Sequence, residues 1–278
     1  MSKFDKVFPL VCGTSFYQQC VPDNFCDVVI STLAAHYLSE ESNFKCLDSI
    51  FPMLSSSNEE MLAYEEVCQR DWEKFLLHRA AELKPGGLLF VVQHLKTSVK
   101  PLRSSSVTMP DQESSTTSFH GGQDIVFDLN SSWTELYEQG LISKEEYEAC
   151  VLRMAIRSLQ ETKAPFENSP PSTGLCLLQE PEQMFVPSIP KQLWRRKLEK
   201  DGVNDRAYFA DLLTKEMRLW TETSFRSSLV NTRTAHEQSD IIERLYDTFR
   251  SKIAAVDPDN YLGDLTLSRL IAQKSVQH

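Results

Sequence analysis

The apolar residues of this chain follow two different periods, which predict strands in some segments and helices in others. Residues 25–32 and 88–93 form short apolar runs, and such runs are typical of strands buried in a parallel sheet. Between Glu59 and Leu83, apolar residues recur at steps of three and four, which predicts one long helix. A strand, a helix and a strand in this order predict a βαβ unit, and hence a parallel sheet with helical cover.

Both ends of the long helix carry the signals expected of helix ends. Ser57 and Asn58 offer an N-cap, and Glu59 and Glu60 follow in the first turn, where the helix dipole favours negative charge. Residues 85–87 read Pro-Gly-Gly, which ends the helix and turns the chain into the second strand.

The second half of the chain is predicted to be mainly helical. Residues 98–124 are rich in Ser, Thr, Pro and Gly, so we expect a mobile surface loop there. Ser143 to Glu146 form a capping-box pattern at the start of a helix. The pattern as a whole predicts helices at 128–139, 143–159, 206–221 and 237–255, short strands near 174–179 and 182–186, and a last strand at 265–272 that returns to the sheet.

Composition narrows the class of protein. Of the 278 residues, 41% are hydrophobic and 24% are charged, which is ordinary for a globular protein with a real core. The net charge of −10 and the scattered basic residues argue against nucleic-acid binding. The seven cysteines include no Cys-x-x-Cys pair, so we expect reduced thiols in the cytoplasm and no disulfide framework or structural zinc site. We expect neither a signal peptide nor a membrane-spanning helix.

Two segments, taken together, resemble the SABATH family of carboxyl and ring-nitrogen methyltransferases. The first reads Gly-Thr-Ser-Phe-Tyr at residues 13–17, Val-Pro at 21–22 and Ser-Thr-Leu-Ala-Ala-His-Tyr-Leu-Ser at 31–39. It is similar to the family's Gly-Ser-Phe-Tyr, Phe-Pro and Ser-Ser-x-x-Leu-His-Trp-Leu-Ser. The second matches the family's long-helix motif at Ala63, Tyr64, Gln69, Asp71, Trp72, Phe75, Leu76, Arg79, Glu82, Leu83 and the Pro-Gly-Gly of residues 85–87.

This resemblance implies an α/β protein with a partial Rossmann-like sheet of the class I methyltransferase type and a mostly helical cap domain. Residues 1–97 would be the C-terminal part of the Rossmann-like core and 98–124 the flexible loop. Residues 125–235 would be the helical cap or substrate domain, and 236–278 a helix and strand that return to the core. The family pattern has further strands and a glycine-containing cofactor loop before these motifs, so we expect the chain to be truncated at its N-terminus.

The resemblance also implies S-adenosylmethionine as the cofactor, with Ser15 and Phe16 at its adenine end. Phe16 would stack on the ring and Ser15 would hydrogen-bond to it, whereas the alternative for Phe16 is an ordinary core position beside the strand. Methyl transfer to an ionised carboxylate requires alignment of the reactants and exclusion of water. We therefore expect no catalytic acid–base residue and no metal.

Five further residues match substrate positions of the family. His36 and Tyr37 stand where the family has His-Trp, at the carboxyl end of a strand, which is where ligands bind in such sheets. Val126, Phe127 and Phe225 would line the substrate pocket in the cap, with Phe127 in place of the usual Trp. The alternative for His36 is a hydrogen-bonded buried histidine, and for the three cap residues it is helix packing.

Two functions remain open at this point. The first is an S-adenosylmethionine-dependent methyltransferase that acts on a small carboxylate or ring nitrogen by in-line transfer. The second is a catalytically inactive family member that serves as a dimerisation module, either as a homodimer or with a complete paralogue. The methyl acceptor stays unassigned, because Tyr37 and Phe127 depart from the pattern typical of salicylate-like acids.

Overall fold

The protein is described here from a computed structural model, which covers residues 8–39, 46–96, 122–167 and 173–276. Most of the expected loop at 98–124 lies outside these ranges. No helix within them is long and apolar enough to cross a membrane.

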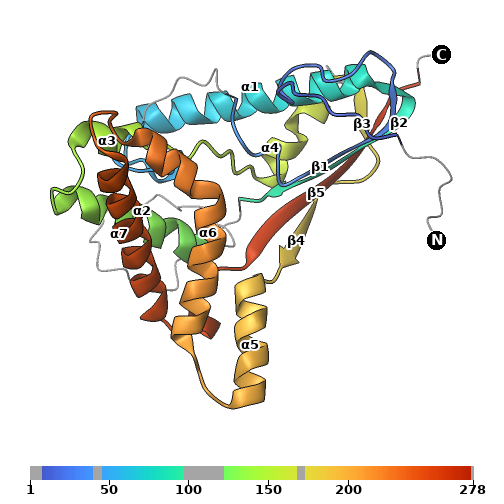
Figure 1. The fold of residues 1–278 in the computed structure, drawn as a ribbon. Helices are drawn as coiled ribbons and strands as arrows, with labels where there is room; N and C mark the ends of the chain where they lie inside the picture. The colour runs from blue at the N-terminus through green and yellow to red at the C-terminus, as the bar shows by residue number, and fades with distance from the viewer. Residues whose placement is uncertain (1–7, 40–45, 97–121, 168–172, 277–278) are drawn as a thin grey trace.

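A mixed sheet forms one part of the molecule (Figure 1). Its strands are β1 (Cys26–Thr32), β2 (Leu83–His94), β3 (Leu175–Leu177), β4 (Glu182–Val186) and β5 (Leu265–Lys274). β1 and β2 pair in parallel, which confirms the predicted βαβ unit, and β5 pairs antiparallel with β2, β3 and β4. The sheet is therefore only partly parallel. The sequence did not predict this, because an apolar pattern marks a strand but carries no information about its direction.

Helix α1 (Asn58–Glu82) covers one face of this sheet. Ser57 caps it by accepting the Glu60 N–H, as the sequence predicts. The α1 side chains pack in one hydrophobic cluster with alternate residues of β2 and β5, namely Trp72, Phe75, Leu76, Ala80, Leu89, Val91, Leu270 and Ala272. This cluster fixes the helix over the sheet, because burial of these apolar surfaces is the main favourable term.

The opposite face of β1 is uncovered within the described residues. Val28 and Ile30 are 48% and 68% exposed, although both are large and apolar. The sequence predicted a buried strand at residues 25–32, and that prediction was wrong for the outer face of β1. The pattern of a short apolar run cannot distinguish one covered face from two, since it depends on which neighbours the tertiary structure supplies.

The helices form a second hydrophobic cluster beside the sheet. They are α2 (Gln123–Glu138), α3 (Lys144–Ala149), α5 (Ile189–Asp201), α6 (Arg206–Ser228) and α7 (Ala235–Ala254), and Figure 1 shows α6 and α7 side by side. The largest buried side chains that these helices contribute are Trp133, Trp194, Phe209, Phe225 and Phe249, and Phe51 and Tyr261 join the cluster from outside the helices. Residues 236–278 were predicted to return to the core as a helix and a strand. Helix α7 packs into the helical cluster instead, and β5 pairs with the sheet.

The predicted helix at 143–159 was wrong in its second half. Helix α3 ends at Ala149, and a short helix α4 (Leu159–Lys163) begins at Leu159 with its own capping box. The residues between form isolated bridges with other segments, Met154 with Tyr37 and Arg157 with Leu95, and the Ala155 N–H donates to the His36 carbonyl at 2.6 Å. Tertiary hydrogen bonds therefore replace the intrahelical ones that the periodicity suggested.

Helix α5 was absent from the sequence prediction. Ser188 accepts the Lys191 N–H at its start, a proline lies in its first turn, and Gly202 ends it with a φ of 70°. Cap, early proline and terminal glycine are the ordinary signals of a helix, so this one was detectable. Three short 3₁₀ turns complete the described chain, at Pro52–Leu54, Ala164–Phe166 and Pro258–Asn260.

Candidate functional site

The segment before β1 is fastened to the C-terminal half of α1. Arg79 donates from Nη1 to the Phe16 carbonyl at 2.7 Å and from Nη2 to the Gln18 carbonyl at 2.9 Å. Glu82 holds this guanidinium in a buried ion pair of 2.6 Å and accepts the Cys20 N–H at 2.6 Å. Because both charged groups are buried and paired, the segment has a defined path across the helix.

Phe16 and Ser15 lie on this fastened segment. The Phe16 ring is half-buried, with its centroid 4.7 Å from that of Tyr17 and 6.1 Å from that of Phe75, which meets it edge-on. Ser15 is exposed, and its hydroxyl accepts the Tyr17 N–H at 3.3 Å. An aromatic ring and a hydroxyl thus stand next to each other at the surface.

Tyr17 joins this segment to the end of β1. Its hydroxyl donates to the Tyr37 carbonyl at 2.5 Å, and its side chain is buried. Burial raises the pKa of the Tyr17 hydroxyl, so the group stays protonated and remains a donor. The structure therefore brings the Ser15–Phe16 pair and the His36–Tyr37 pair together through one buried phenol.

His36 is a buried, neutral imidazole. Its side chain is 2% exposed, and its ring meets His94 edge-on at 4.7 Å and Tyr37 at 4.3 Å. Burial, followed by the nearby His94, lowers the pKa of His36 to about 3, and burial lowers that of His94 to about 4. The His36 Nδ1 atom has no hydrogen-bond partner among the described residues. A buried polar atom without a partner is costly, so this nitrogen lacks a hydrogen bond that the described residues do not supply.

Arg157 supports the same region from the sheet side of α1. Its guanidinium is buried and donates to the carbonyls of Ala35 (3.2 Å) and Cys68 (2.8 Å) and to the Gln93 side chain (3.2 Å). Its Cζ lies 5.2 Å from the Trp72 ring centre. These contacts tie the segment after β1 to the end of β2 and to α1, and Ala35 is the chain neighbour of His36.

Sequence reasoning missed His94 and Arg157. His94 is the last residue of β2, at a strand's carboxyl end, and the rule that selected His36 would also have selected it. Arg157 carried no such signal, because it lies in the segment that the periodicity assigned to a helix. Only the pairing of Leu95 with Arg157 as an isolated bridge reveals its place.

The three predicted cap residues lie on the helices. Val126 and Phe127 belong to α2, where Val126 packs against the helical cluster and Phe127 is 37% exposed. Phe225 belongs to α6 and is fully buried, with its ring 4.9 Å from that of Trp133. Phe225 therefore contributes to the core of the helical cluster, and a part in substrate binding stays a prediction for all three.

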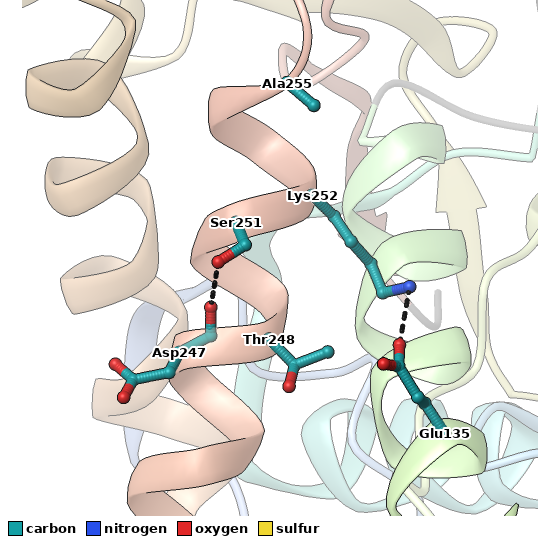
Figure 2. Close-up of a pocket in the computed structure, with 6 residues that line it drawn as sticks. All are labelled: Glu135, Asp247, Thr248, Ser251, Lys252 and Ala255. Carbon is teal, nitrogen blue, oxygen red and sulfur yellow. Dashed lines mark hydrogen bonds and ion pairs between the residues drawn. The ribbon is translucent and has the colours of Figure 1, made fainter.

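A polar surface groove runs between α2 and α7 (Figure 2). Lys252 reaches across it to Glu135, with 3.1 Å between Nζ and the carboxylate. None of the residues selected from the sequence lines this groove. Its lining is Glu135, Asp247, Thr248, Ser251, Lys252 and Ala255. We assign it no ligand, because its charged side chains already have partners, Lys252 with Glu135 and Asp247 with Arg250.

One cluster of side chains of the kinds that bind metal ions occurs within the described ranges. The Cys46 sulfur and carboxylate oxygens of Asp48 and Glu60 lie within 4.8 Å of one another. Ser56 already donates to Asp48 at 2.8 Å and Ser55 to Glu60 at 2.6 Å. Burial and the two carboxylates raise the pKa of the Cys46 thiol to about 12, so the sulfur is protonated at neutral pH. The absence of a metal stays a prediction.

The sequence was compared with family profiles and with known proteins, and it is similar to methyltransferases. A family profile described as "SAM dependent carboxyl methyltransferase" matches residues 1–256. Indole-3-acetate O-methyltransferase 1 of Arabidopsis thaliana is 28% identical over 158 residues, which cover 54% of this chain and 37% of that protein. Gibberellic acid methyltransferase 2 of the same species is 26% identical over 157 residues, covering 54% and 38%. The matched segment thus spans under two-fifths of either relative.

Among solved structures, a loganic acid methyltransferase with SAH superposes with a TM-score of 0.64 at 18% identity. The match covers 95% of this chain and 66% of that one. At this identity the likeness shows the fold, which agrees with the predicted methyltransferase-like sheet and helices.

Proposed function

Because the chain belongs to the family of SAM-dependent carboxyl methyltransferases, we propose that it carries part or all of a site that methylates a small carboxylic acid. One observation carries the proposal: the Tyr17 hydroxyl bonds to the Tyr37 carbonyl at 2.5 Å and so joins Ser15–Phe16 to His36–Tyr37 at the end of β1. A ring nitrogen is the second class of acceptor that the SABATH resemblance allows.

The described residues fit the adenine end of S-adenosylmethionine. A half-buried Phe16 ring offers a stacking surface, and the exposed Ser15 hydroxyl next to it offers a hydrogen bond. The cofactor supplies an electrophilic methyl group when it is bound. The chain's own contribution is to hold the adenine in a fixed place relative to His36 and Tyr37. The reaction between cofactor and acceptor then becomes effectively unimolecular.

His36 and Tyr37 fit the acceptor end. At neutral pH both His36 and His94 are uncharged, so the orphaned His36 Nδ1 can take part in a hydrogen bond without an opposing charge buried nearby. Burial raises the pKa of Tyr37, so its hydroxyl is a neutral donor, and it is 40% exposed. Neutral donors orient a carboxylate without neutralising it, and the carboxylate keeps its nucleophilic oxygen.

The proposal is tested by calorimetric titration of the 278-residue chain with S-adenosylmethionine and S-adenosylhomocysteine. We expect binding that Phe16→Ala weakens at least about fivefold, since base–aromatic stacking contributes about 1–3 kcal/mol. Phe185→Ala is the matched control, because Phe185 lies on β4 and is 72% exposed. Binding that is equally strong in the Phe16 variant would refute the assignment of this residue.

If the folded chain binds neither compound, the site needs further polypeptide, and pairing at the uncovered β1 edge is where we would seek it. A dimer is our additional proposal, and sedimentation of the chain tests it.

We also propose a cytoplasmic location for the protein. It is supported by the seven cysteines, all of which are free thiols. Fractionation of cells that express a tagged chain tests this location.

A further inference from the structure

Arg157 carries a buried positive charge that forms no ion pair within the described part of the chain. Three arginine or lysine side chains are buried there, namely Arg79, Arg157 and Lys191. Glu82 pairs with Arg79 at 2.6 Å, and Asp264 lies 3.8 Å from Lys191. The hydrogen-bond acceptors of Arg157 are two backbone carbonyls and one side-chain amide, and its Nε has no partner among the described residues. A buried charge without a counter-charge is costly, so an anion near Arg157 would be bound favourably.

The groups that hold the Arg157 guanidinium are neutral and are bonded to one another. Gln93 Nε2 donates to the Thr162 hydroxyl at 3.2 Å, and the Gln93 amide oxygen accepts from Arg157 at 3.2 Å. Trp72 Nε1 donates to the Thr162 carbonyl at 3.0 Å, and the Arg157 Cζ lies 5.2 Å from the centre of the Trp72 ring. These contacts fix the guanidinium in place, but they supply no negative charge.

The buried charge stands next to the acceptor end of the proposed site. Arg157 donates to the carbonyl of Ala35, the residue before His36, at 3.2 Å. The His36 carbonyl in turn accepts the N–H of Ala155, two residues before Arg157, at 2.6 Å. Burial is the first cause that lowers the pKa of His36, and the positive charge of Arg157 is a further one. The two segments therefore bring an unpaired cation close to an imidazole that is itself uncharged.

We propose that Arg157 is a specificity-determining residue whose charge selects an anionic methyl acceptor, a carboxylate, over a neutral nitrogen heterocycle. The proposal rests on the proposed function, because it assumes an acceptor at His36 and Tyr37. Arg157 is 3% exposed, so it acts on the acceptor through its electric field and not by contact. In a low-dielectric interior this field attracts a carboxylate that neutral donors hold nearby. Because methylation turns the carboxylate into a neutral ester, the same charge favours the acid over its product.

A first experiment tests the unpaired charge without any ligand. Gln93→Glu places a carboxylate where the Gln93 amide oxygen lies 3.2 Å from Arg157. We expect the free energy of unfolding of this variant in urea, relative to the wild type, to be no lower at pH 7 than at pH 5, because the new carboxylate ionises readily beside an unpaired guanidinium. Gln183→Glu, at an exposed position of β4, controls for the added charge. A relative stability that falls from pH 5 to pH 7 would show that the new carboxylate resists ionisation, and the proposal would be wrong.

A second experiment measures selectivity by calorimetric titration with two matched pairs of probes, benzoate with benzamide and phenylacetate with phenylacetamide. The wild type should bind each acid at least about tenfold more tightly than its amide. Arg157→Gln should reduce this ratio to about threefold or less, whereas Arg157→Lys, which keeps the charge, should preserve most of it. Arg153→Gln, at an exposed arginine of the same segment, should leave the ratio unchanged. A ratio that survives in Arg157→Gln would overturn the proposal.

Gln93→Glu provides a second test of selectivity that keeps Arg157 in place. Its own carboxylate occupies the charge, so the preference for the acid should disappear, and this holds even where Arg157→Gln does not fold. Equal binding of acid and amide by the wild type would refute selection by Arg157 and leave the acceptor site in place. Failure to bind S-adenosylmethionine would instead count against the proposed function, and it would leave the measured ratio of acid to amide unaffected.

Discussion

Glu146 is the residue where charge matters most to the helical part of the molecule. Its carboxylate is fully buried and binds Arg233 through two contacts of 2.5 and 2.6 Å. It also accepts the backbone N–H of Val230 at 3.0 Å and of Ser143 at 2.9 Å. The Arg233 hydrogen bonds come first among the causes that lower the pKa of Glu146 to about 2. One side chain thus links α3 to the turn between α6 and α7.

The first prediction concerns this carboxylate. A carboxyl whose pKa is lowered in the folded state stabilises that state fully above its usual value of 4.5, and this stabilisation is lost as the pH falls towards about 2. Glu146→Gln should therefore lower the free energy of unfolding at pH 7 by about 3 kcal/mol, the low end for a broken buried pair. Urea unfolding at pH 7 and pH 3 measures both values.

At pH 3 the gap between the wild type and the Glu146→Gln variant should be smaller, since the Glu146 carboxyl of the unfolded wild-type chain is then mostly protonated and must release that proton on folding. Glu138→Gln serves as the control, because Glu138 is exposed on α2. A gap of the same size at both pH values would show that the ion pair is not what stabilises this corner.

At the residue scale, the sequence selected part of the candidate site. Ser15, Phe16, His36 and Tyr37 could be chosen because their motifs are local in the chain, and the Tyr17–Tyr37 hydrogen bond places them side by side. That bond joins residues twenty positions apart, and no local pattern encodes it. The roles of these residues in binding remain predictions.

At the scale of elements, the passage from α1 into β2 depends on Gly87. A Cβ at this position would lie 2.9 Å from the Lys84 carbonyl oxygen and 3.1 Å from that of Asp27. Both atoms are backbone, and they belong to the two strands of the parallel pair, where the register shifts between Cys26 and Val28. The Pro-Gly-Gly run was predicted to end the helix, and Gly87 also allows β1 and β2 to approach each other.

The second prediction follows from this close approach. Gly87→Ala should lower the free energy of unfolding by about 1–3 kcal/mol, because neither carbonyl can move without disturbing the strand pair. Gly13→Ala is the matched control, since nothing lies within 4 Å of a Cβ there. Chemical denaturation followed by circular dichroism compares the two. Equal stability of both variants would show that the strands shift without cost.

At the scale of the whole molecule, β1 is an edge strand with an apolar outer face. Val28 and Ile30 are exposed there, and β1 has no strand on its other side among the described residues. An exposed apolar edge is a site for pairing with another polypeptide or for aggregation. The face of the sheet under α1 is therefore well packed, whereas the outer face of β1 is free to associate with another polypeptide.

The third prediction is that Ile30→Lys reduces self-association of the chain. A lysine places charge on the open face of β1 and disfavours pairing of two such faces. Light scattering measured over a range of protein concentrations should rise less steeply for this variant than for the wild type. Leu219→Lys is the control, because Leu219 is 89% exposed on α6, away from the sheet. An equal decrease in both variants would point to net charge as the cause.

The sequence by itself determined the local elements of this protein. The period of the apolar residues and the capping signals located β1, α1, β2, α6, α7 and β5 to within a few residues, except that β2 already begins at Leu83 and α6 extends to Ser228. These signals act over one or two turns of the chain, so they are present in the sequence. The family motifs at residues 13–39 and 63–87 are local in the same sense.

The tertiary structure alone decided the rest. It set the antiparallel direction of β5, turned residues 150–158 away from a helix, left one face of β1 open, and brought Arg157 to the Ala35 carbonyl, next to His36 in the chain. Each of these depends on hydrogen bonds or packing between residues far apart in the chain. Such contacts compete with local preference and prevail where they satisfy buried polar groups or cover apolar surface.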